Sequence, residues 1–237
     1  MNSQQILSNV FGLRINGGPG SGNFGHEGRP GEVGGSGGGG SEGDSDPHIS
    51  SLLKKGQEDQ FMNSLSSEER IAISEYKGED PYAPGAAIAL NGMLRAGEKL
   101  SDAQKSALEK LDSAFRKAPR LSKGTTLYRG TSEPMEFDRD GYLKDTKAFI
   151  STTTDKSKAQ EFSSYMGGSN TSMYEIHAPK NLTVLPTRQF LKGESSISEE
   201  KELLLPRGLS IKRVGSHDNV TILEVMGGSA WMLKDVK

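Results

Sequence analysis

The hydrophobic periodicity of this chain changes at Pro119, and the change restricts the possible folds more than any other feature of the sequence. Before Pro119, apolar residues recur at the spacing of one helix face, most clearly over residues 107–115. After Pro119, the chain consists of short segments rich in β-branched or aromatic residues and bounded by Gly, Pro or Asn, which is typical of strands. Helices followed by strands predict an α+β domain rather than a repeated βαβ unit.

Local sequence signals define the individual elements. Ser66 followed by Glu69, and Ser101 followed by Gln104, are capping boxes, so we expect helices to begin there and to end near Tyr76 and before Pro119. An earlier helical stripe consists of Leu52, Leu53, Phe61, Met62 and Leu65, and further helices are predicted over residues 86–95 and 156–165. Strands are predicted at residues 125–129, 147–152, 173–177, 182–186, 201–206, 209–214 and 220–225.

The N-terminal segment has a different composition from the rest of the chain. Residues 17–43 read GGPGSGNFGHEGRPGEVGGSGGGGSEG and contain almost no apolar side chain. Such a segment cannot bury enough surface to offset the entropy lost on ordering. GPGSGNFG is not a phosphate-binding loop, because it neither follows a strand nor opens a helix and lacks the GK[ST] ending. We therefore expect a flexible tail over residues 1–47 and one folded domain over residues 48–237.

The overall composition argues against several classes of protein. The net charge is -2, so we expect no direct nucleic-acid binding. No apolar run is long enough to cross a bilayer, and MNSQQILSNVFGL lacks the pattern of a secretory signal. The chain has no cysteine, which excludes disulfides and thiolate metal sites, and the four histidines have no metal-ligand spacing, so we expect no metal.

Three of the predicted strands carry polar groups that a purely structural strand does not need. Arg129 and Gly130 end the first; alone this arginine reads as a surface cation, although its guanidinium also matches a phosphate pair and the glycine permits a close ligand. Ser151, Thr152 and Thr153 end the second, where an ordinary strand end or helix cap is the usual explanation.

The third strand opens with an acidic cluster. Glu200 and Glu202 alternate with Lys201, so at strand period both carboxylates face the same side. Like charges beside a core are unfavourable unless a ligand or a cation uses them. A solvated turn is nevertheless the commoner explanation for a single acidic cluster.

Taken together and in this order, LYRG, FISTT and EKELLLPRG resemble the R-S-E signature of arginine-specific mono-ADP-ribosyltransferases, a family that includes binary-toxin enzymes and phage-encoded enzymes. The resemblance spans residues 125–208. One element would be weak evidence, whereas three in order, each with its flanking residues, are strong evidence. The resemblance implies N-terminal helices packed on two facing, mainly antiparallel β-sheets, with NAD in the cleft between them.

The resemblance also implies roles for the residues that end the first two strands. Arg129 would hold the NAD phosphates, and the backbone of Gly130 would meet the carboxamide of nicotinamide. Ser151 would orient the catalytic glutamate, Thr152 and Thr153 would support the strand end, and all three would belong to the NAD-binding residues. Thr153 departs from the family's S-T-S pattern but keeps a hydroxyl.

The remaining implied roles concern the acidic cluster and two helices. Glu202 would bind the nicotinamide ribose and stabilise the cation formed as nicotinamide leaves, and Glu200 would position the acceptor arginine. Phe162 would lie near nicotinamide, with a core position as an equally weighted alternative. Asn91 would be an NAD contact, although Ala87 replaces the tyrosine that precedes it in related proteins.

These roles predict transfer of ADP-ribose from NAD to an exposed arginine of a host protein, which we expect to be bacterial, with release of nicotinamide. Cleavage of the glycosidic bond produces an oxocarbenium-like ribose that a fixed carboxylate stabilises, so no metal is needed. The alternatives are NAD glycohydrolysis and a non-catalytic phage module that retains the fold. The Gly-rich tail resembles segments of phage-encoded proteins, which predicts action in the cytoplasm of a bacterial host and association with a virion before delivery.

Overall fold

A computed structural model describes residues 47–78, 83, 85–131, 134–165, 172–187, 190 and 201–228 of the 237-residue chain. The predicted N-terminal tail lies outside these residues except for Pro47, so its boundary with the folded domain stays a prediction. None of the helices in the described part combines the length and the apolarity that a membrane span requires.

The helices in the first half of the described chain follow the capping and periodicity signals closely. They are α2 (Pro47–Leu52), α3 (Gln57–Ser64), α4 (Ser67–Lys77), α5 (Ala87–Ala96) and α6 (Asp102–Lys117). Both capping boxes form, with Ser66 and Glu69 at the start of α4 and Ser101 and Gln104 at the start of α6. The early apolar stripe is divided between α2 and α3, because Gly56 adopts a left-handed backbone with φ of 75°.

The strands follow α6 and confirm the predicted α+β order. They are β1 (Thr125–Thr131), β2 (Ile150–Thr153), β3 (Ser172–Ala178), β4 (Leu185–Pro186), β5 (Glu202–Leu205), β6 (Ser210–His217) and β7 (Val220–Gly227), with helix α7 (Lys156–Tyr165) between β2 and β3. The expectation of two facing sheets is not met, since these strands form one seven-stranded sheet in the order β4-β5-β2-β1-β3-β7-β6. Pairing is antiparallel throughout except between β3 and β7.

The sheet is weakest between β1 and β2. β1 pairs with β3 along its whole length, from Thr125↔Ala178 to Thr131↔Ser172. Its register with β2 is the single pair Tyr128↔Thr153. We call residues 128–130 and 151–153 the strand junction. The two halves of the sheet are therefore joined by one registered residue pair at this junction.

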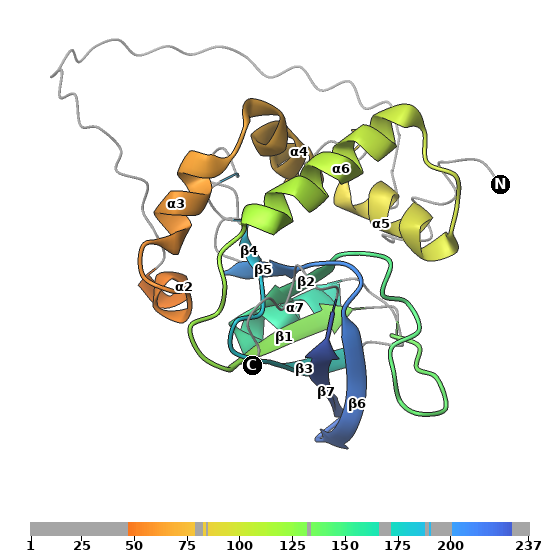
Figure 1. Cartoon of the computed structure of the whole chain (residues 1–237). Helices are drawn as coiled ribbons and strands as arrows, with labels where there is room; N and C mark the ends of the chain where they lie inside the picture. Colours follow the sequence, from red (N-terminus) through yellow and green to blue (C-terminus); the bar gives the residue numbers. More distant parts are fainter. Residues whose placement is uncertain are drawn as a thin grey trace, which may run out of the picture. The chain divides into compact units, whose positions relative to one another are not determined.

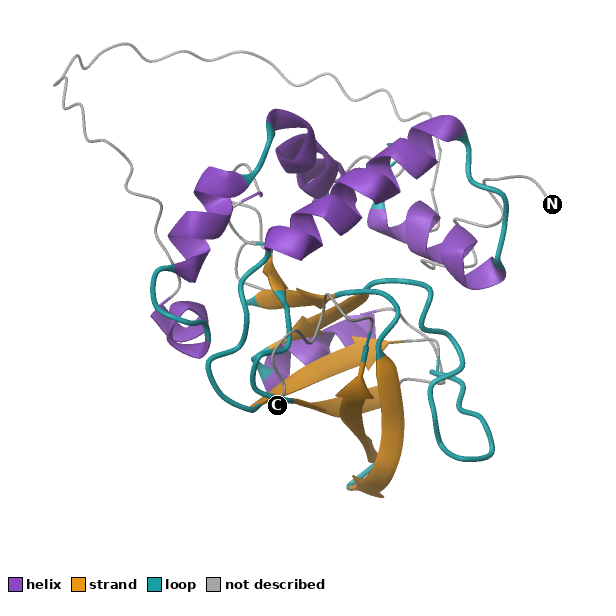
Figure 2. Cartoon of the chain, in the orientation of Figure 1, coloured by secondary structure: helices purple, strands orange, loops and turns teal. Residues whose placement is uncertain are grey.

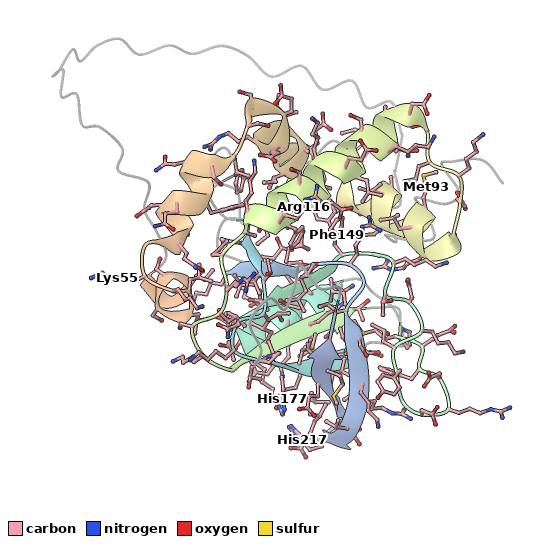
Figure 3. The ribbon with its side chains drawn as sticks, viewed as in Figure 1. Lys55, Met93, Arg116, Phe149, His177 and His217 are labelled. Atoms are coloured by element: carbon pink, nitrogen blue, oxygen red, sulfur yellow. The ribbon has the colours of Figure 1, made fainter. Side chains whose placement is uncertain are left out.

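Helices α3 to α6 lie together on one side of the sheet (Figures 1 and 2). Strand β5 is buried on both faces: Leu204 belongs to the apolar cluster under these helices, whereas Leu203 and Leu205 belong to a second cluster. Phe149 lies between the helices and the sheet (Figure 3) and stacks on Phe115 with a centroid separation of 5.1 Å. Burial on two faces explains why this strand is a continuous leucine run rather than an alternating one.

An ion pair fastens α6 to the chain just beyond β5. Arg207 donates from Nε to Asp112 of α6 at 2.9 Å, and its Nη2 contacts the other carboxylate oxygen. The hydrogen bond that Arg207 donates to Asp112 raises the pKa of the Arg207 guanidinium. A two-point contact of this kind restricts orientation as well as distance, so it fixes the end of β5 against the helices.

Candidate active site

Glu202 is the first residue of β5 and is 4% exposed. Side chains alternate along a strand, so Glu202 faces the same way as Leu204, toward the helices. Opposite it on β2 lies Thr153, and opposite Leu204 lies Ser151. Cross-strand partners share a face, so the β2–β5 register brings Ser151 and Glu202 to one face of the sheet.

Three donors hold the Glu202 carboxylate. The Ser151 hydroxyl donates a hydrogen bond to Oε1, and the Thr187 hydroxyl donates one to Oε2. The ammonium of Lys77, at the end of α4, lies 2.8 Å from the same Oε2. Burial alone would raise the pKa of Glu202, but the charge and hydrogen bond of Lys77 and the two hydroxyls outweigh burial and lower the pKa. The carboxylate is therefore ionised at neutral pH.

Glu202 and its three donors, Ser151, Thr187 and Lys77, form what we call the carboxylate cluster. Arg129 lies between this cluster and a pocket. Its Nη1 donates to the backbone carbonyl of Ser151 at 2.9 Å, across the strand junction. Its Nε is buried without a hydrogen-bond partner among the described residues. Burial and repulsion from Arg95 lower the pKa of Arg129. A buried, unused donor next to a second arginine is a natural binding point for an anion.

The pocket at Arg129 has a volume of about 350 Å³. Its lining contains Arg95, Arg129, Thr131, Pro134, Met135, Glu136, Leu143, Lys144, Asp145, Ala148, Phe149 and Ile150. Ser151 and Glu202 are not part of that lining, so the pocket adjoins the carboxylate cluster through Arg129 rather than containing it. Arg95 is paired with Asp145 at 3.2 Å, at the edge of the same pocket.

Gly130 serves the packing of α7, which sequence reasoning had not considered. A Cβ at this position would fall 1.7 Å from the carbonyl oxygen of Ala159 and 2.8 Å from the backbone nitrogen of Ser163. The missing side chain therefore makes room for the backbone of α7, and the expectation that the glycine also lets a ligand approach the backbone stays a prediction. A contact between the Gly130 backbone and nicotinamide stays a prediction.

Thr152 and Thr153 are both buried and use their hydroxyls within the protein. Thr152 donates to the carbonyl of Leu203 on β5, and Thr153 accepts from the backbone nitrogen of Asp155 at 3.1 Å. Asp155 in turn accepts from the backbone nitrogen of Ser157 at 2.9 Å and so caps α7. These contacts hold the end of β2 in place, which is the supporting role expected for the two threonines.

Asn91 and Phe162, the two site residues predicted on helices, have different surroundings. Asn91 donates to the hydroxyl of Tyr76 at 2.7 Å and accepts from the backbone nitrogen of Phe149 at 3.1 Å, so it ties α5 to α4 and to the start of β2. Its contact with NAD stays a prediction. Phe162 is 39% exposed, so the alternative that placed it in the core of α7 is wrong.

Glu200 lies outside the described residues. The prediction that it faces the same way as Glu202 assumed an extended backbone between them. Lys201 instead has a left-handed backbone with φ of 47°, and β5 begins only at Glu202. Strand alternation therefore does not fix the direction of Glu200, and its role stays a prediction.

Two residues of the carboxylate cluster, Lys77 and Thr187, were missed by sequence reasoning. A basic residue in the last turn of a helix is common, because it complements the helix dipole, so Lys77 had nothing to distinguish it. Thr187 directly follows the two-residue strand β4 and belongs to no recognisable motif. Only the packing of α4 and β4 against β5 brings the two side chains together.

Within the described ranges, no group of three or more His, Asp or Glu side chains is arranged to hold a metal ion.

The sequence model of the family described as ADP-ribosyltransferase exoenzyme matches residues 53–229, which include all the described strands. The chain belongs to this family. No curated protein matches the sequence.

Solved structures show the same fold at low sequence identity. Plx2a, an ADP-ribosyltransferase toxin from Paenibacillus larvae, is 17% identical with a TM-score of 0.51, over 71% of this chain and 90% of that one. A mutant of the eukaryotic mono-ADP-ribosyltransferase ART2.2 in complex with NAD is 17% identical with a TM-score of 0.50, over 70% of each chain. The enzymatic component C2-I of the C2 toxin from Clostridium botulinum is 15% identical with a TM-score of 0.51, over 73% of this chain and 46% of that one.

Proposed function

We propose that this protein transfers ADP-ribose from NAD to an arginine side chain of another protein and releases nicotinamide. The observation that carries the proposal is the buried Glu202 carboxylate, which accepts a hydrogen bond from Ser151, whose backbone carbonyl accepts one from Arg129. NAD is the co-substrate of this reaction and is the ligand of the ART2.2 complex that shares the fold.

The arrangement suits cleavage of the bond between nicotinamide and ribose. The bond's electron pair leaves with the nicotinamide nitrogen, and positive charge develops on the ribose carbon and ring oxygen. A fixed carboxylate stabilises that charge without rearranging, which is the largest contribution to catalysis in reactions of this type. Glu202 is the group we assign to this role. Arg129, with its buried Nε lacking a partner among the described residues, is the group we assign to the NAD phosphates.

The acceptor arginine needs a second carboxylate, and Glu200 is the candidate. A guanidinium is protonated at physiological pH, so it becomes a nucleophile only when it loses a proton as the new bond forms. In this scheme an arginine nitrogen attacks the ribose carbon and its proton passes to Glu200. Water needs less help, so NAD hydrolysis without transfer is the second candidate function.

A variant at Glu200 separates the two functions. Glu200→Gln keeps the shape of the side chain and removes its basic site. We expect this variant to lose transfer to agmatine, an arginine analogue, and to keep most of its NAD hydrolysis. Release of nicotinamide and formation of ADP-ribosyl-agmatine are measured in parallel on the full chain. Glu199→Gln, which removes the neighbouring charge, is the matched control and should retain both activities.

The other outcomes correct the proposal in defined ways. Equal loss of both activities in Glu200→Gln would make Glu200 an NAD-binding or structural group. Unchanged transfer would mean that this carboxylate does not hold the acceptor. A wild-type chain that releases nicotinamide but never modifies agmatine or protein would identify a glycohydrolase, and a chain with neither activity would support the non-catalytic phage module.

For the physiological setting, we propose a bacterial host protein as acceptor and the host cytoplasm as the place of action, with a virion as carrier before delivery. The basis is the resemblance of the Gly-rich segment to phage-encoded sequences. Incubation with labelled NAD and bacterial lysate, followed by mass spectrometry of modified sites, tests both the acceptor residue and the target.

A further inference from the structure

Lys77 is an unusual neighbour for a carboxylate that must stabilise a cation. Its side chain is 13% exposed and its ammonium lies 2.8 Å from Oε2 of Glu202. A positive charge so close opposes the positive charge that develops on the ribose during bond cleavage. We therefore expect Lys77 to contribute to the site in another way, and the contacts of the Glu202 carboxylate indicate how.

The donors are divided unequally between the two oxygens of Glu202. Lys77 and Thr187 both contact Oε2, whereas Ser151 alone contacts Oε1. A carboxylate has roughly four acceptor positions, two on each oxygen. Among the contacts of the described residues, both positions on Oε2 are used and one on Oε1 is left. A substrate hydroxyl that reaches Oε1 would therefore find an acceptor position there without displacing any of these donors.

We propose that Lys77 is a positioning residue for the transfer reaction: with Thr187 it fixes Oε2 of Glu202 and leaves Oε1 as the oxygen that receives the nicotinamide ribose. This inference rests on the proposed function. Lys77 acts through Glu202 and needs no contact with substrate. The helix that carries Lys77 is fixed at its other end by the capping box of Ser66 and Glu69, so the lysine is delivered from a rigid element.

The charge of Lys77 has a second consequence for the same carboxylate. Among the described residues, the charged groups that act on Glu202 are Lys77 from α4 and Arg129 from β1, and Tyr76 of α4 lies close enough for the Glu202 charge to help raise its pKa. Of these, Lys77 contributes most to lowering the pKa of Glu202 against the effect of burial. Without it, only the hydroxyls of Ser151 and Thr187 would oppose the effect of burial, so the pKa of Glu202 should be higher.

The test compares Lys77→Met with Lys77→Arg in the full chain, using nicotinamide release as a function of pH. We expect Lys77→Met to lower kcat near pH 7 roughly 10- to 100-fold, because a small loss of orientation is costly in a site of this kind. The KM for NAD should change much less than kcat. The acid limb of the pH profile should move to higher pH, since the pKa of Glu202 is then higher. Lys77→Arg should keep the acid limb in place and recover part of kcat.

The matched control is Lys117→Met. Lys117 pairs with Glu69, another buried glutamate, at 2.7 Å, away from the strand junction. The Lys117→Met variant should have a lower melting temperature, with kcat and the pH profile unchanged. A structural effect of removing the lysine partner of a buried glutamate would appear in both variants, whereas a shifted acid limb should appear only in Lys77→Met.

Two results would overturn the inference. One is an unshifted acid limb in folded Lys77→Met, and the other is a kcat at or above the wild-type value, which would mean that Lys77 competes with substrate. If Lys77→Met does not fold, Thr187→Val decides instead: it removes only the hydroxyl, and an unchanged kcat contradicts fixation of Oε2. A wild-type chain without NAD cleavage refutes the proposed function itself, which distinguishes the two failures.

Discussion

The part of the chain that the structure describes contains two buried glutamates with nearly the same set of contacts, at two different places in the fold. Glu69 at the start of α4 is 3% exposed, and Glu202 at the start of β5 is 4% exposed. In Glu69, the Ser113 hydroxyl donates to Oε1 at 2.7 Å, and Lys117 lies 2.7 Å from Oε2. In Glu202, a serine and a lysine occupy the same two positions.

Their third donors and their neighbours differ. Oε2 of Glu69 also accepts from the backbone nitrogen of Ser66, so this carboxylate completes a helix cap and ties α4 to α6. Oε2 of Glu202 instead accepts from the Thr187 hydroxyl, and Glu202 lies beside Arg129 at the strand junction. In both glutamates burial opposes ionisation and the donors outweigh it, so both pKa values are lowered. Burial and a lowered pKa therefore do not identify a catalytic carboxylate; an adjacent binding site does.

The largest expected difference between the two glutamates is in catalysis. Glu202→Gln should lower the rate of nicotinamide release ~10²–10³-fold, because one preorganised charge is lost from the site where positive charge develops. Glu69→Gln, measured in the same assay, should retain the wild-type rate. Near-normal NAD cleavage in a folded Glu202→Gln variant would remove Glu202 from the catalytic machinery and with it the distinction drawn between the clusters.

The two serines allow a finer comparison. Ser151→Ala leaves Glu202 charged but held on one side only, so kcat should fall roughly 10-fold while the KM for NAD changes little. Ser113→Ala removes the equivalent donor from Glu69 and should leave kcat unchanged. Equal turnover in the two alanine variants would show that the Ser151 hydroxyl is a structural donor like that of Ser113.

The stability of the helix layer should depend on Glu69. Glu69→Ala removes the capping box of α4 and the contacts with Ser113 and Lys117, at a cost of about 1–2 kcal/mol in the free energy of unfolding. The cost is moderate because the Lys117 side chain is 36% exposed and can regain water. Urea denaturation measures it, with Lys105→Ala, which breaks an exposed pair with Asp102, as a control that should change little. An unchanged midpoint in Glu69→Ala would show that the buried cluster does not stabilise the fold.

The sequence was most informative where a signal is local. Capping boxes predicted the starts of α4 and α6, because they depend on residues three positions apart. The bounds of α7, Lys156–Tyr165, and the meeting of Ser151 with Glu202 were also predicted, the second through the family motif rather than through geometry.

The features that the sequence did not predict depend on contacts between distant segments of the chain. The single sheet follows from the Tyr128↔Thr153 pair, and the use of Gly130 in packing α7, which the sequence did not indicate, follows from the position of Ala159. Lys77 and Thr187 reach Glu202 from two separate elements, and neither position carries a pattern that distinguishes it from an ordinary surface residue. Packing alone determines such contacts, so a single sequence does not contain a local signal for them.

The smallest expected effect is one in which the two glutamates should behave alike. Each pKa lies below its ordinary value of 4.5, so each carboxylate contributes stability that is present above about that pH and is lost as the pH falls through the lowered pKa. Glutamine resembles a protonated glutamate, so the free energies of unfolding of Glu69→Gln and of wild type should converge as the pH falls below 4.5. Glu202→Gln should show the same convergence, although it differs in catalysis. Denaturation at a series of pH values measures the free energies of unfolding of wild type and both variants. Parallel curves for wild type and Glu202→Gln would mean that the Glu202 carboxylate is not held in its ionised form by Lys77, Ser151 and Thr187, and the likeness between the two clusters would then be one of geometry only.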